Sequence, residues 1–361
     1  MSKTIKVGII GCGAIAAEKY LKALKSVQEV QVVAFCDIIP ERAEKTRILY
    51  ESPDAKTYID YKELLKDDSI EAVHVCTPNK SHAPITVDAL KAGKHVMCEK
   101  PMAKNYKEAK QMYDTALETG KLLTIGYQLR CAPSALYLKK MCENGELGEI
   151  YYAKAHALRR RGVPTWGVFL NEEEQGGGPL IDIGTHAIDL TLWMMDNYKP
   201  KSVMGSVYKK LSDHPDCGNI FGAWDPEKYT VEDSAFGFIL MENGATIVLE
   251  SSWALNIGDE GEAMCTLCGT EAGATMKGGL QIVSDKHGKF TDTKPSFDEG
   301  AILYVPGGKM YTPEETESRN FYDAILYGAE LRVKPEQALV VTQILEAIYK
   351  SGKTGKPVYF K

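Results

Sequence analysis

A glycine-rich turn joins the first apolar run of this 361-residue chain to its first amphipathic segment. The run covers residues 6–10, and the turn at 11–16 has the pattern GxGxxA. Gly11 permits a tight turn, Gly13 lets a ligand approach the backbone, and Ala16 lets a helix pack closely on the strand. The pattern predicts a dinucleotide-binding βαβ unit, with packing alone as the competing interpretation. The N–H groups expected near the pyrophosphate belong to Gly11, Gly13, Ala14 and Ile15.

An acidic residue ends the second apolar run, which covers residues 30–36. It is Asp37, 24 positions after Gly13. In such units a carboxylate near this spacing accepts hydrogen bonds from the adenosine ribose. The same carboxylate would repel a 2′-phosphate, so the sequence favours NAD over NADP. The alternative is an acid that merely ends a strand.

The first part of the chain alternates short apolar runs with amphipathic segments. Strand-like runs cover 6–10, 30–36, 72–76, 95–98 and 122–126. Helix-like segments between them cover 14–25, 40–49, 81–92 and 106–118. Gly93 and Gly120 follow two of these, where a helix commonly ends in a left-handed residue. The alternation predicts an α/β Rossmann domain with a doubly wound parallel sheet over residues 1–128.

The rhythm changes after about residue 130. Helical patterns are expected at 133–144, 184–195, 313–327 and 335–349. Strand patterns are expected at 150–157, 202–208, 234–241, 246–252 and 263–267. Because few helices separate these strands, they predict a large, mostly antiparallel sheet. Residues 129–361 are therefore expected to form a second, α+β domain.

Composition excludes several classes of protein. Apolar residues make up 44% and charged residues 25%, as in ordinary globular chains. Lys and Arg number 43 and Asp and Glu 49, a net charge of −6, which argues against a nucleic-acid or anionic-membrane partner. No apolar stretch approaches the roughly 18 residues that a membrane helix needs. We therefore expect a cytoplasmic protein.

Nine scattered cysteines are expected to be reduced thiols. Cys265 and Cys268 form a lone CxxC in a strand-like stretch, where positions i and i+3 face opposite sides. No second such pair exists in the sequence, so no metal site is expected.

Polar residues follow the later strands of the predicted parallel sheet. The carboxyl ends of such strands line the ligand crevice, so a lysine in Glu99-Lys100-Pro101 would lie near a cofactor. A solvated turn is the ordinary alternative. The further cofactor-binding candidates at these ends are Thr77, Pro78, Asn79, His82, Glu99, Lys100, Gln128 and Arg130.

A second motif follows the glycine run at 176–178. Asp182 and His186 are four positions apart, so a helix would place both side chains on one face. A carboxylate beside an imidazole raises its pKa and orients it, which suits general acid–base chemistry. A structural hydrogen bond is the simpler interpretation. No third ligand at a telling spacing points to a metal.

These three motifs, in this order, resemble the Gfo/Idh/MocA family of glucose–fructose oxidoreductase, inositol dehydrogenase and their relatives. The resemblance extends over essentially the whole chain. It implies that Lys100, Asp182 and His186 form the catalytic group. It also implies that the second domain, residues 129–361, binds the substrate and that its open sheet mediates a homodimer or homotetramer.

Four segments, 158–169, 222–226, 229–234 and 250–257, look like a sugar-acting branch of this family that includes D-glucoside 3-dehydrogenases. A carbohydrate or polyol substrate is therefore expected. Trp166 would stack on a pyranose ring, and Arg159 and Asn256 would bind hydroxyls. Arg160, Trp224 and Trp253 are weaker candidates of the same kind. Alternatively the tryptophans lie in the core or at an interface, and the arginines on a salt-bridged edge.

The favoured reaction is hydride transfer between a sugar secondary alcohol and NAD. His186 would accept the hydroxyl proton, Asp182 would orient it, and Lys100 would polarise the oxygen. Lys100 as the base remains open. Two alternatives remain: an NAD-retaining glycosidase that acts by transient oxidation at C3 and elimination, and a non-catalytic sugar or dinucleotide sensor.

Overall fold

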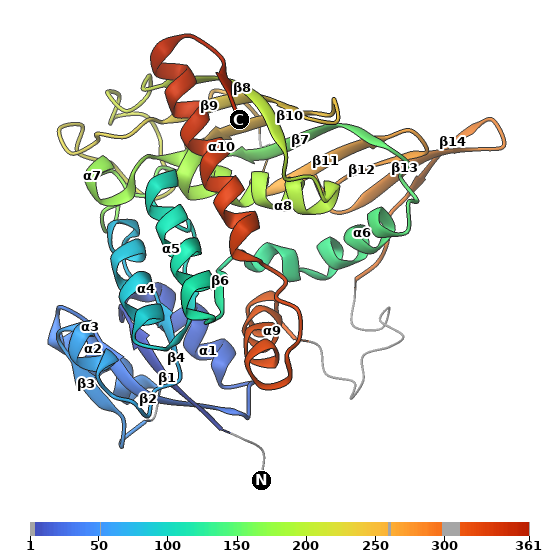
Figure 1. Ribbon diagram of the computed structural model, residues 1–361. Coiled ribbons are helices and arrows are strands. Elements are labelled where there is room, and N and C mark those ends of the chain that lie inside the picture. Colours follow the sequence, from blue (N-terminus) through green and yellow to red (C-terminus); the bar gives the residue numbers. More distant parts are fainter. Residues whose placement is uncertain (1–3, 51, 259–260, 298–310, 361) are drawn as a thin grey trace. The chain divides into compact units, whose positions relative to one another are not determined.

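The computed structural model describes residues 4–50, 52–258, 261–297 and 311–360, which form two compact units (Figure 1). One unit comprises Met1–Cys131 and Tyr311–Leu339, and the other Ala132–Met310 and Val340–Lys361. This division differs from the predicted one, 1–128 and 129–361, chiefly because residues 311–339 belong to the first unit.

The first unit contains a six-stranded sheet with the order β3-β2-β1-β4-β5-β6. Every neighbouring pair is parallel. This order is typical of doubly wound dinucleotide-binding sheets and confirms the predicted fold class. The strands are β1 (Ile5–Ile10), β2 (Val30–Cys36), β3 (Lys56–Tyr58), β4 (Ala72–Val75), β5 (His95–Cys98) and β6 (Leu123–Ile125).

The helices of this unit largely follow the predicted pattern. One example is α5 (Tyr106–Thr119), where the Asn105 side chain accepts a hydrogen bond from the Glu108 N–H and Gly120 ends the helix at φ 65°. The others are η1 (Ala16–Tyr20), α1 (Leu21–Leu24), α2 (Pro40–Leu49), α3 (Tyr61–Leu65), η2 (Asn79–Ser81), α4 (His82–Lys91), η3 (Gln128–Cys131) and α9 (Pro313–Tyr327). The helix expected at 14–25 contains a π-helical stretch, η1.

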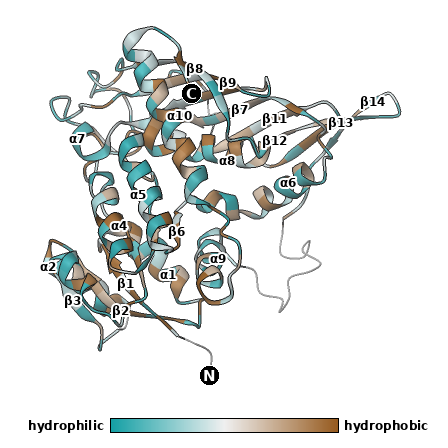
Figure 2. Ribbon diagram, viewed as in Figure 1, coloured by the Kyte–Doolittle hydropathy of each residue, from teal (hydrophilic) through white to brown (hydrophobic). Residues whose placement is uncertain are grey.

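One apolar cluster joins the sheet to α1, α2 and α9. Figure 2 shows hydrophobic residues along β1 and β2, where Val7, Ile9 and Phe35 belong to this cluster. Phe321 and Tyr322 of α9 are fully buried in it. This burial explains why residues 311–339 belong to the first unit, since an amphipathic pattern does not reveal which partner a helix packs against.

The second unit contains a nine-stranded sheet with the order β14-β13-β12-β11-β7-β10-β9-β8-β15. Only β7 and β10 pair in parallel, which confirms a mostly antiparallel sheet. The strands are β7 (Ile150–Leu158), β8 (Pro200–Tyr208), β9 (Ser234–Met241), β10 (Thr246–Ser252), β11 (Met264–Gly269), β12 (Ala272–Thr275), β13 (Gln281–Lys286), β14 (Lys289–Thr293) and β15 (Val358–Tyr359).

Two helices pack on this sheet. Helix α8 (Thr185–Met195), which follows η4 (Leu180–Gly184), contacts β7 and β11. Helix α10 (Pro335–Thr354) begins in the first unit and crosses the unit boundary. Its later part packs on β8 and β9, where a Cβ on Gly205 would come within 2.9 Å of the Ile348 carbonyl oxygen. The remaining helices are α6 (Pro133–Glu143) and α7 (Glu172–Gln175).

Among the described residues, no helix combines the length and the apolar character needed to cross a membrane.

Candidate active site

The glycine loop has the geometry that its sequence predicts. Gly11 has φ 91°, and a Cβ there would lie 2.7 Å from the backbone of Cys76, so both conformation and space require glycine. A Cβ on Gly13, by contrast, would meet no other described atom within 4 Å. The chain thus leaves space beside the first turn of a helix, whose N–H groups have no partners within the helix. These features fit a dinucleotide pyrophosphate.

The carboxylate of Asp37 lies against this loop. Its two oxygens accept hydrogen bonds from the backbone N–H of Cys12 and of Ile39, both at 2.9 Å. The side chain is largely buried. The contact with Cys12 brings the acid that ends β2 to the glycine loop, where a ribose-binding carboxylate is expected.

The ends of β4 and β5 are braced by His82. Its ring nitrogens lie 2.8 Å from the carbonyl oxygens of Thr77 and Pro101. Burial lowers the pKa of His82, although both carbonyls favour the protonated ring. The hydroxyl of Thr77 is buried with no hydrogen-bond partner among the described residues, as expected for a group that faces a ligand. Pro78 and Asn79 follow Thr77 at this edge, at the start of η2.

Glu99 anchors the backbone of Lys100 directly after β5. Its Oε2 accepts a hydrogen bond from the Lys100 N–H at 3.0 Å, and its Oε1 accepts one from the Tyr20 hydroxyl at 2.8 Å. Burial acts to raise the pKa of Glu99, but the nearby Lys19 and Lys100 lower it overall. Glu99 is therefore ionised and fixes the backbone of Lys100 through this hydrogen bond.

Gln128 and Arg130, in η3, contact other parts of the first unit. The Gln128 Oε1 accepts a hydrogen bond from Lys19 Nζ at 3.1 Å. Arg130 is fully buried and donates to the Arg332 carbonyl oxygen at 2.9 Å and to Gln337 Oε1 at 2.6 Å. These contacts give both side chains a structural role, and their contact with a cofactor stays a prediction.

In the second unit, Asp182 lies in the π-helical turn η4 and His186 in the first turn of α8. The Trp253 indole N–H donates to Asp182 Oδ2 at 3.0 Å. Trp253 is fully buried, so this bond holds the carboxylate in one orientation. Single π-helical turns within helices are frequent at functional sites.

The N-terminus of this helix is held by the buried carboxylate of Glu232. It accepts hydrogen bonds from the N–H of Gly178 at 2.8 Å and of Leu180 at 3.1 Å, and from the Tyr349 hydroxyl at 2.8 Å. Burial raises the pKa of Glu232, and these donors oppose the shift. A Cβ on Gly177 would lie 2.0 Å from the Tyr349 oxygen, so the glycine run is required for close packing.

Gly177→Ala is therefore expected to destabilise the protein by roughly 1–3 kcal/mol, because the Tyr349 side chain must move. Gly218→Ala is the matched control, since a Cβ there meets nothing within 4 Å. Thermal unfolding of both variants checks this prediction, and equal midpoints would contradict it.

The predicted sugar-binding residues differ in their surroundings. Arg159 pairs with Glu262 and donates to the Gly162 carbonyl oxygen at 2.9 Å, as on a salt-bridged edge. Asn256 accepts a hydrogen bond from Arg161. Trp166 is 52% exposed, and its ring centroid lies 4.8 Å from that of Phe221 in an edge-to-face contact.

The weaker tryptophan candidates are buried. Trp224 is 5% exposed and its indole N–H donates to the Ser212 carbonyl oxygen at 2.6 Å. Trp253 is buried as well, with its indole on Asp182. The core interpretation is therefore the correct one for these two rings.

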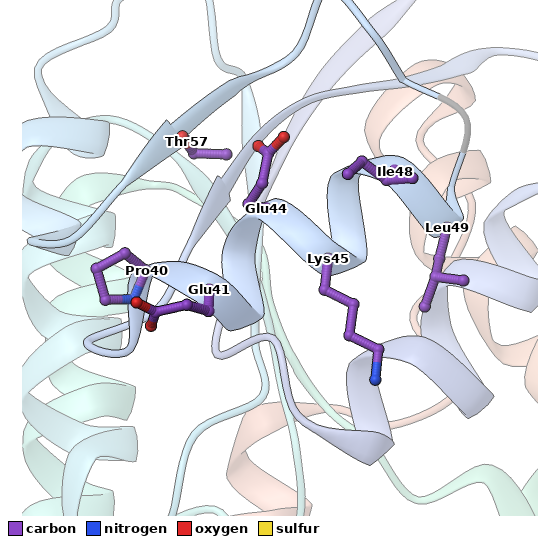
Figure 3. A pocket seen from close by; sticks show the side chains of 7 residues that line it. All are labelled: Pro40, Glu41, Glu44, Lys45, Ile48, Leu49 and Thr57. Atoms are coloured by element: carbon purple, nitrogen blue, oxygen red, sulfur yellow. The ribbon is translucent and has the colours of Figure 1, made fainter.

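Two other features do not include the predicted site residues. Figure 3 shows a pocket bordered by α2 and Thr57 of β3, with Glu41, Glu44, Lys45 and Ile48 around it. None of its lining residues is a predicted site residue. Cys265 and Cys268 lie on β11 as predicted, one buried and one partly exposed.

Comparison with known proteins identifies the family. Residues 5–127 match the model of the "Oxidoreductase family, NAD-binding Rossmann fold", and residues 135–275 match the "GFO/IDH/MocA C-terminal domain". A D-glucoside 3-dehydrogenase of Escherichia coli (strain K12) is 36% identical over 99% of this chain and 98% of that protein. The chain belongs to the Gfo/Idh/MocA family. The resemblance inferred from the sequence is thus confirmed, and the first unit is an NAD-binding Rossmann domain.

A second relative and a solved structure also match the chain. An inositol 2-dehydrogenase/D-chiro-inositol 3-dehydrogenase of Lactiplantibacillus plantarum is 33% identical over 58% of this chain and 59% of that protein. A levoglucosan dehydrogenase solved with NADH and levoglucosan has a TM-score of 0.83 at 22% identity, covering 99% of both chains. At that identity the likeness shows a common fold.

Sequence reasoning missed a buried charge cluster formed by Lys19 of η1, Glu99 and Glu317 of α9. Lys19 Nζ pairs with Glu99 Oε1 and lies 3.3 Å from Glu317 Oε2. Burial acts to lower the pKa of Lys19, but Glu317 and Glu99 raise it overall. Burial raises the pKa of Glu317 to about 7 although Lys19 opposes it. No short-range sequence pattern predicts this cluster, because Lys19 and Glu317 are far apart in the sequence.

This cluster predicts a pH-dependent stability. The pKa of Glu317 is about 7 in the folded protein against an ordinary 4.5, so the folded state binds more protons between these values. Stability therefore falls as pH rises through this window. Relative to Glu317→Gln, the wild type should lose about 2–3 kcal/mol between about pH 5 and pH 8.

Thermal unfolding at the two pH values measures this difference. Asp323→Asn removes the same charge from the same helix and serves as the control, because Asp323 does not contribute to the pKa shift of Glu317. If the difference in stability between the wild type and Glu317→Gln does not vary with pH, the raised pKa of Glu317 is contradicted.

Proposed function

We propose that this protein is an NAD-dependent dehydrogenase that transfers a hydride between a secondary alcohol of a sugar or sugar derivative and the nicotinamide. The observation that carries the proposal is the end-to-end similarity to a D-glucoside 3-dehydrogenase. The open space at Gly13 and the Asp37 carboxylate at the glycine loop support it from the structure. A glucoside or related polyol is the proposed substrate.

The cofactor would be held by the glycine loop and the strand ends. Gly13, Ala14 and Ile15 offer backbone N–H groups to the pyrophosphate, and Asp37 offers a carboxylate to the ribose. The Gly11 N–H, also expected there, donates instead to the Cys36 carbonyl oxygen at 2.8 Å, so Gly11 serves the turn. The buried hydroxyl of Thr77 offers a further hydrogen bond. When bound, the nicotinamide supplies the acceptor or donor of the hydride.

Three side chains carry the proton chemistry. In oxidation, the C–H bond releases a hydride, the O–H bond releases a proton to His186, and a C=O bond forms. Asp182, fixed by the Trp253 indole, orients His186 and stabilises its charged form. The Lys100 ammonium stabilises the negative charge that develops on the oxygen.

Sugar recognition is proposed for the loop that carries Trp166. Its half-exposed ring offers an apolar face to the C–H groups of a pyranose. Arg159 and Asn256 are proposed to bind hydroxyls, although each already has a protein partner. Trp166 is therefore the strongest of the three candidates for sugar binding.

The test is NADH formation by the purified protein across a panel of glucosides, free hexoses, inositols and anhydro sugars, with NADP in parallel. Turnover of glucosides with NAD is the expected result. Release of an aglycone without net NADH would favour the glycosidase. Tight NADH binding with no turnover of any compound would favour the sensor.

A preference for NAD over NADP is proposed from Asp37, whose carboxylate would repel a 2′-phosphate. Asp37→Ser with Ile38→Arg is expected to raise the NADP-to-NAD ratio of kcat/KM by at least about tenfold, equal to about 1.4 kcal/mol. Ile38 is highly exposed, so an arginine there fits without repacking. Glu41→Gln, an exposed carboxylate in the first turn of α2, is the control. An unchanged ratio would refute the role of Asp37.

We also propose a cytoplasmic homodimer or homotetramer that associates through the large sheet. Gly237 faces α10, so by alternation its neighbour Phe238 points to the other face, where it is 53% exposed. Light scattering of the purified protein tests the oligomeric state.

A further inference from the structure

The buried charge cluster of Lys19, Glu99 and Glu317 takes no part in the proposed proton transfer, yet it adjoins Lys100. Glu99 divides its carboxylate between two tasks. Its Oε1 accepts hydrogen bonds from Lys19 Nζ and from the Tyr20 hydroxyl, and its Oε2 accepts one from the backbone N–H of Lys100. The helix that follows the glycine loop is thereby linked to the peptide of Lys100 through a single carboxylate.

We propose that Lys19 is a positioning residue for Lys100, acting through Glu99, and that Glu317 balances its charge. The inference rests on the proposed function, because it takes Lys100 as the group that stabilises the reacting oxygen. It adds a connection between the cofactor-binding loop and the catalytic lysine.

Stability alone does not account for the cluster. The side chains of Lys19, Glu99 and Glu317 are 9%, 7% and 5% exposed. Withdrawing such charges from water costs several kcal/mol per ion, and apolar replacements of a buried ion pair are often as stable or more so. What the ions supply and an apolar cluster does not is a directional bond to the Lys100 peptide. The geometry thus favours a role in orientation.

Two further hydrogen bonds support the role of Lys19 as a positioning residue. Its Nζ also donates to Gln128 Oε1 at 3.1 Å and to the Gly126 carbonyl oxygen at 3.5 Å. Lys19 therefore links the glycine-loop helix to the ends of both β5 and β6. A Cβ on Gly126 would lie 2.5 Å from the Tyr20 oxygen, 3.0 Å from Glu99 Oε1 and 3.1 Å from Lys19 Nζ. Glycine at 126 leaves the space that the cluster occupies.

The test is a charge-balanced variant, Lys19→Met with Glu317→Gln, assayed at a pH above the pKa of about 7 of Glu317, so that it removes one charge of each sign. Active sites are counted by NADH titration, and kcat per site, KM and the NADH dissociation constant are measured. We expect kcat per site to fall by about 10- to 100-fold, as for a misplaced catalytic group, while the dissociation constant stays close to that of the wild type. Lys94→Met is the matched control, because Lys94 is also buried in the first unit but bonds to the Asp67 carbonyl oxygen instead.

A wild-type kcat per site in the charge-balanced variant overturns the inference, as does an equal loss in Lys94→Met. If that variant does not fold, Gly126→Ala decides by the same measurements, because it displaces the cluster and keeps every charge. Lys100→Met is assayed alongside. If the wild type turns over no compound of the panel, the proposed function fails. Turnover that survives Lys100→Met overturns the role of Lys100 and this inference with it, whereas turnover lost there but kept in the cluster variant contradicts only this inference.

Discussion

Lys100→Met is expected to lower kcat by about 10²–10³-fold, with the NADH dissociation constant close to that of the wild type. The magnitude is that of removing one preorganised donor from a developing oxyanion. Methionine keeps the length of the four-atom stem and removes the ammonium group, with its charge and its hydrogen-bond donors. Glu99 still holds the backbone N–H of residue 100 in the variant, so the loop after β5 should keep its course.

Steady-state kinetics with the best substrate of the panel, together with NADH fluorescence titration, measure both quantities. Lys91→Met is the control, because Lys91 is exposed at the end of α4. A kcat within a few-fold of the wild type would remove Lys100 from the reaction. A large rise in the NADH dissociation constant with unchanged kcat would make it a cofactor-binding residue only.

The parts of the site predicted from sequence are those fixed by local chemistry. The turn at Gly11 needs a positive φ and has no room for a Cβ, so its sequence pattern is diagnostic. The position of Asp37 beside this turn could also be predicted, because β1 and β2 are adjacent parallel strands whose carboxyl ends meet at one edge of the sheet. The fold class could be predicted because strands and helices alternate along the chain, and each has a short-range periodicity that is visible in the sequence.

The parts that escaped prediction depend on contacts between distant segments. The apolar pattern of α9 predicts a helix over 313–327, but only the folded structure shows that Phe321 and Tyr322 pack in the first unit. Glu317 reaches Lys19 for the same reason. The outer strands β12–β15 also escaped, because they are short and partly exposed and carry a weak alternation of polar and apolar residues.

The substrate side shows a different limit. A tryptophan in a sequence does not reveal whether its ring binds a ligand or fills a core. Trp253 fills a core with its buried ring and also bonds to a predicted catalytic residue, because its indole N–H donates to Asp182. Such a contact joins β10's end to η4 and is invisible to spacing arguments.

The second large effect is expected at His186. His186→Ala should lower kcat by about 10²–10⁴-fold, the range for loss of a general base, with little change in NADH binding. Asp182→Asn should have a smaller effect, since it keeps a side chain of the same shape beside the Trp253 indole but removes the charge that stabilises protonated His186. Turnover measured across pH provides the decisive readout: the rising limb of kcat/KM in the wild type should disappear in His186→Ala. His214→Ala, at an exposed histidine of the same unit, should behave as the wild type. If His186→Ala retains both turnover and the rising limb, the proton acceptor is Lys100, and the roles of the two residues must be exchanged.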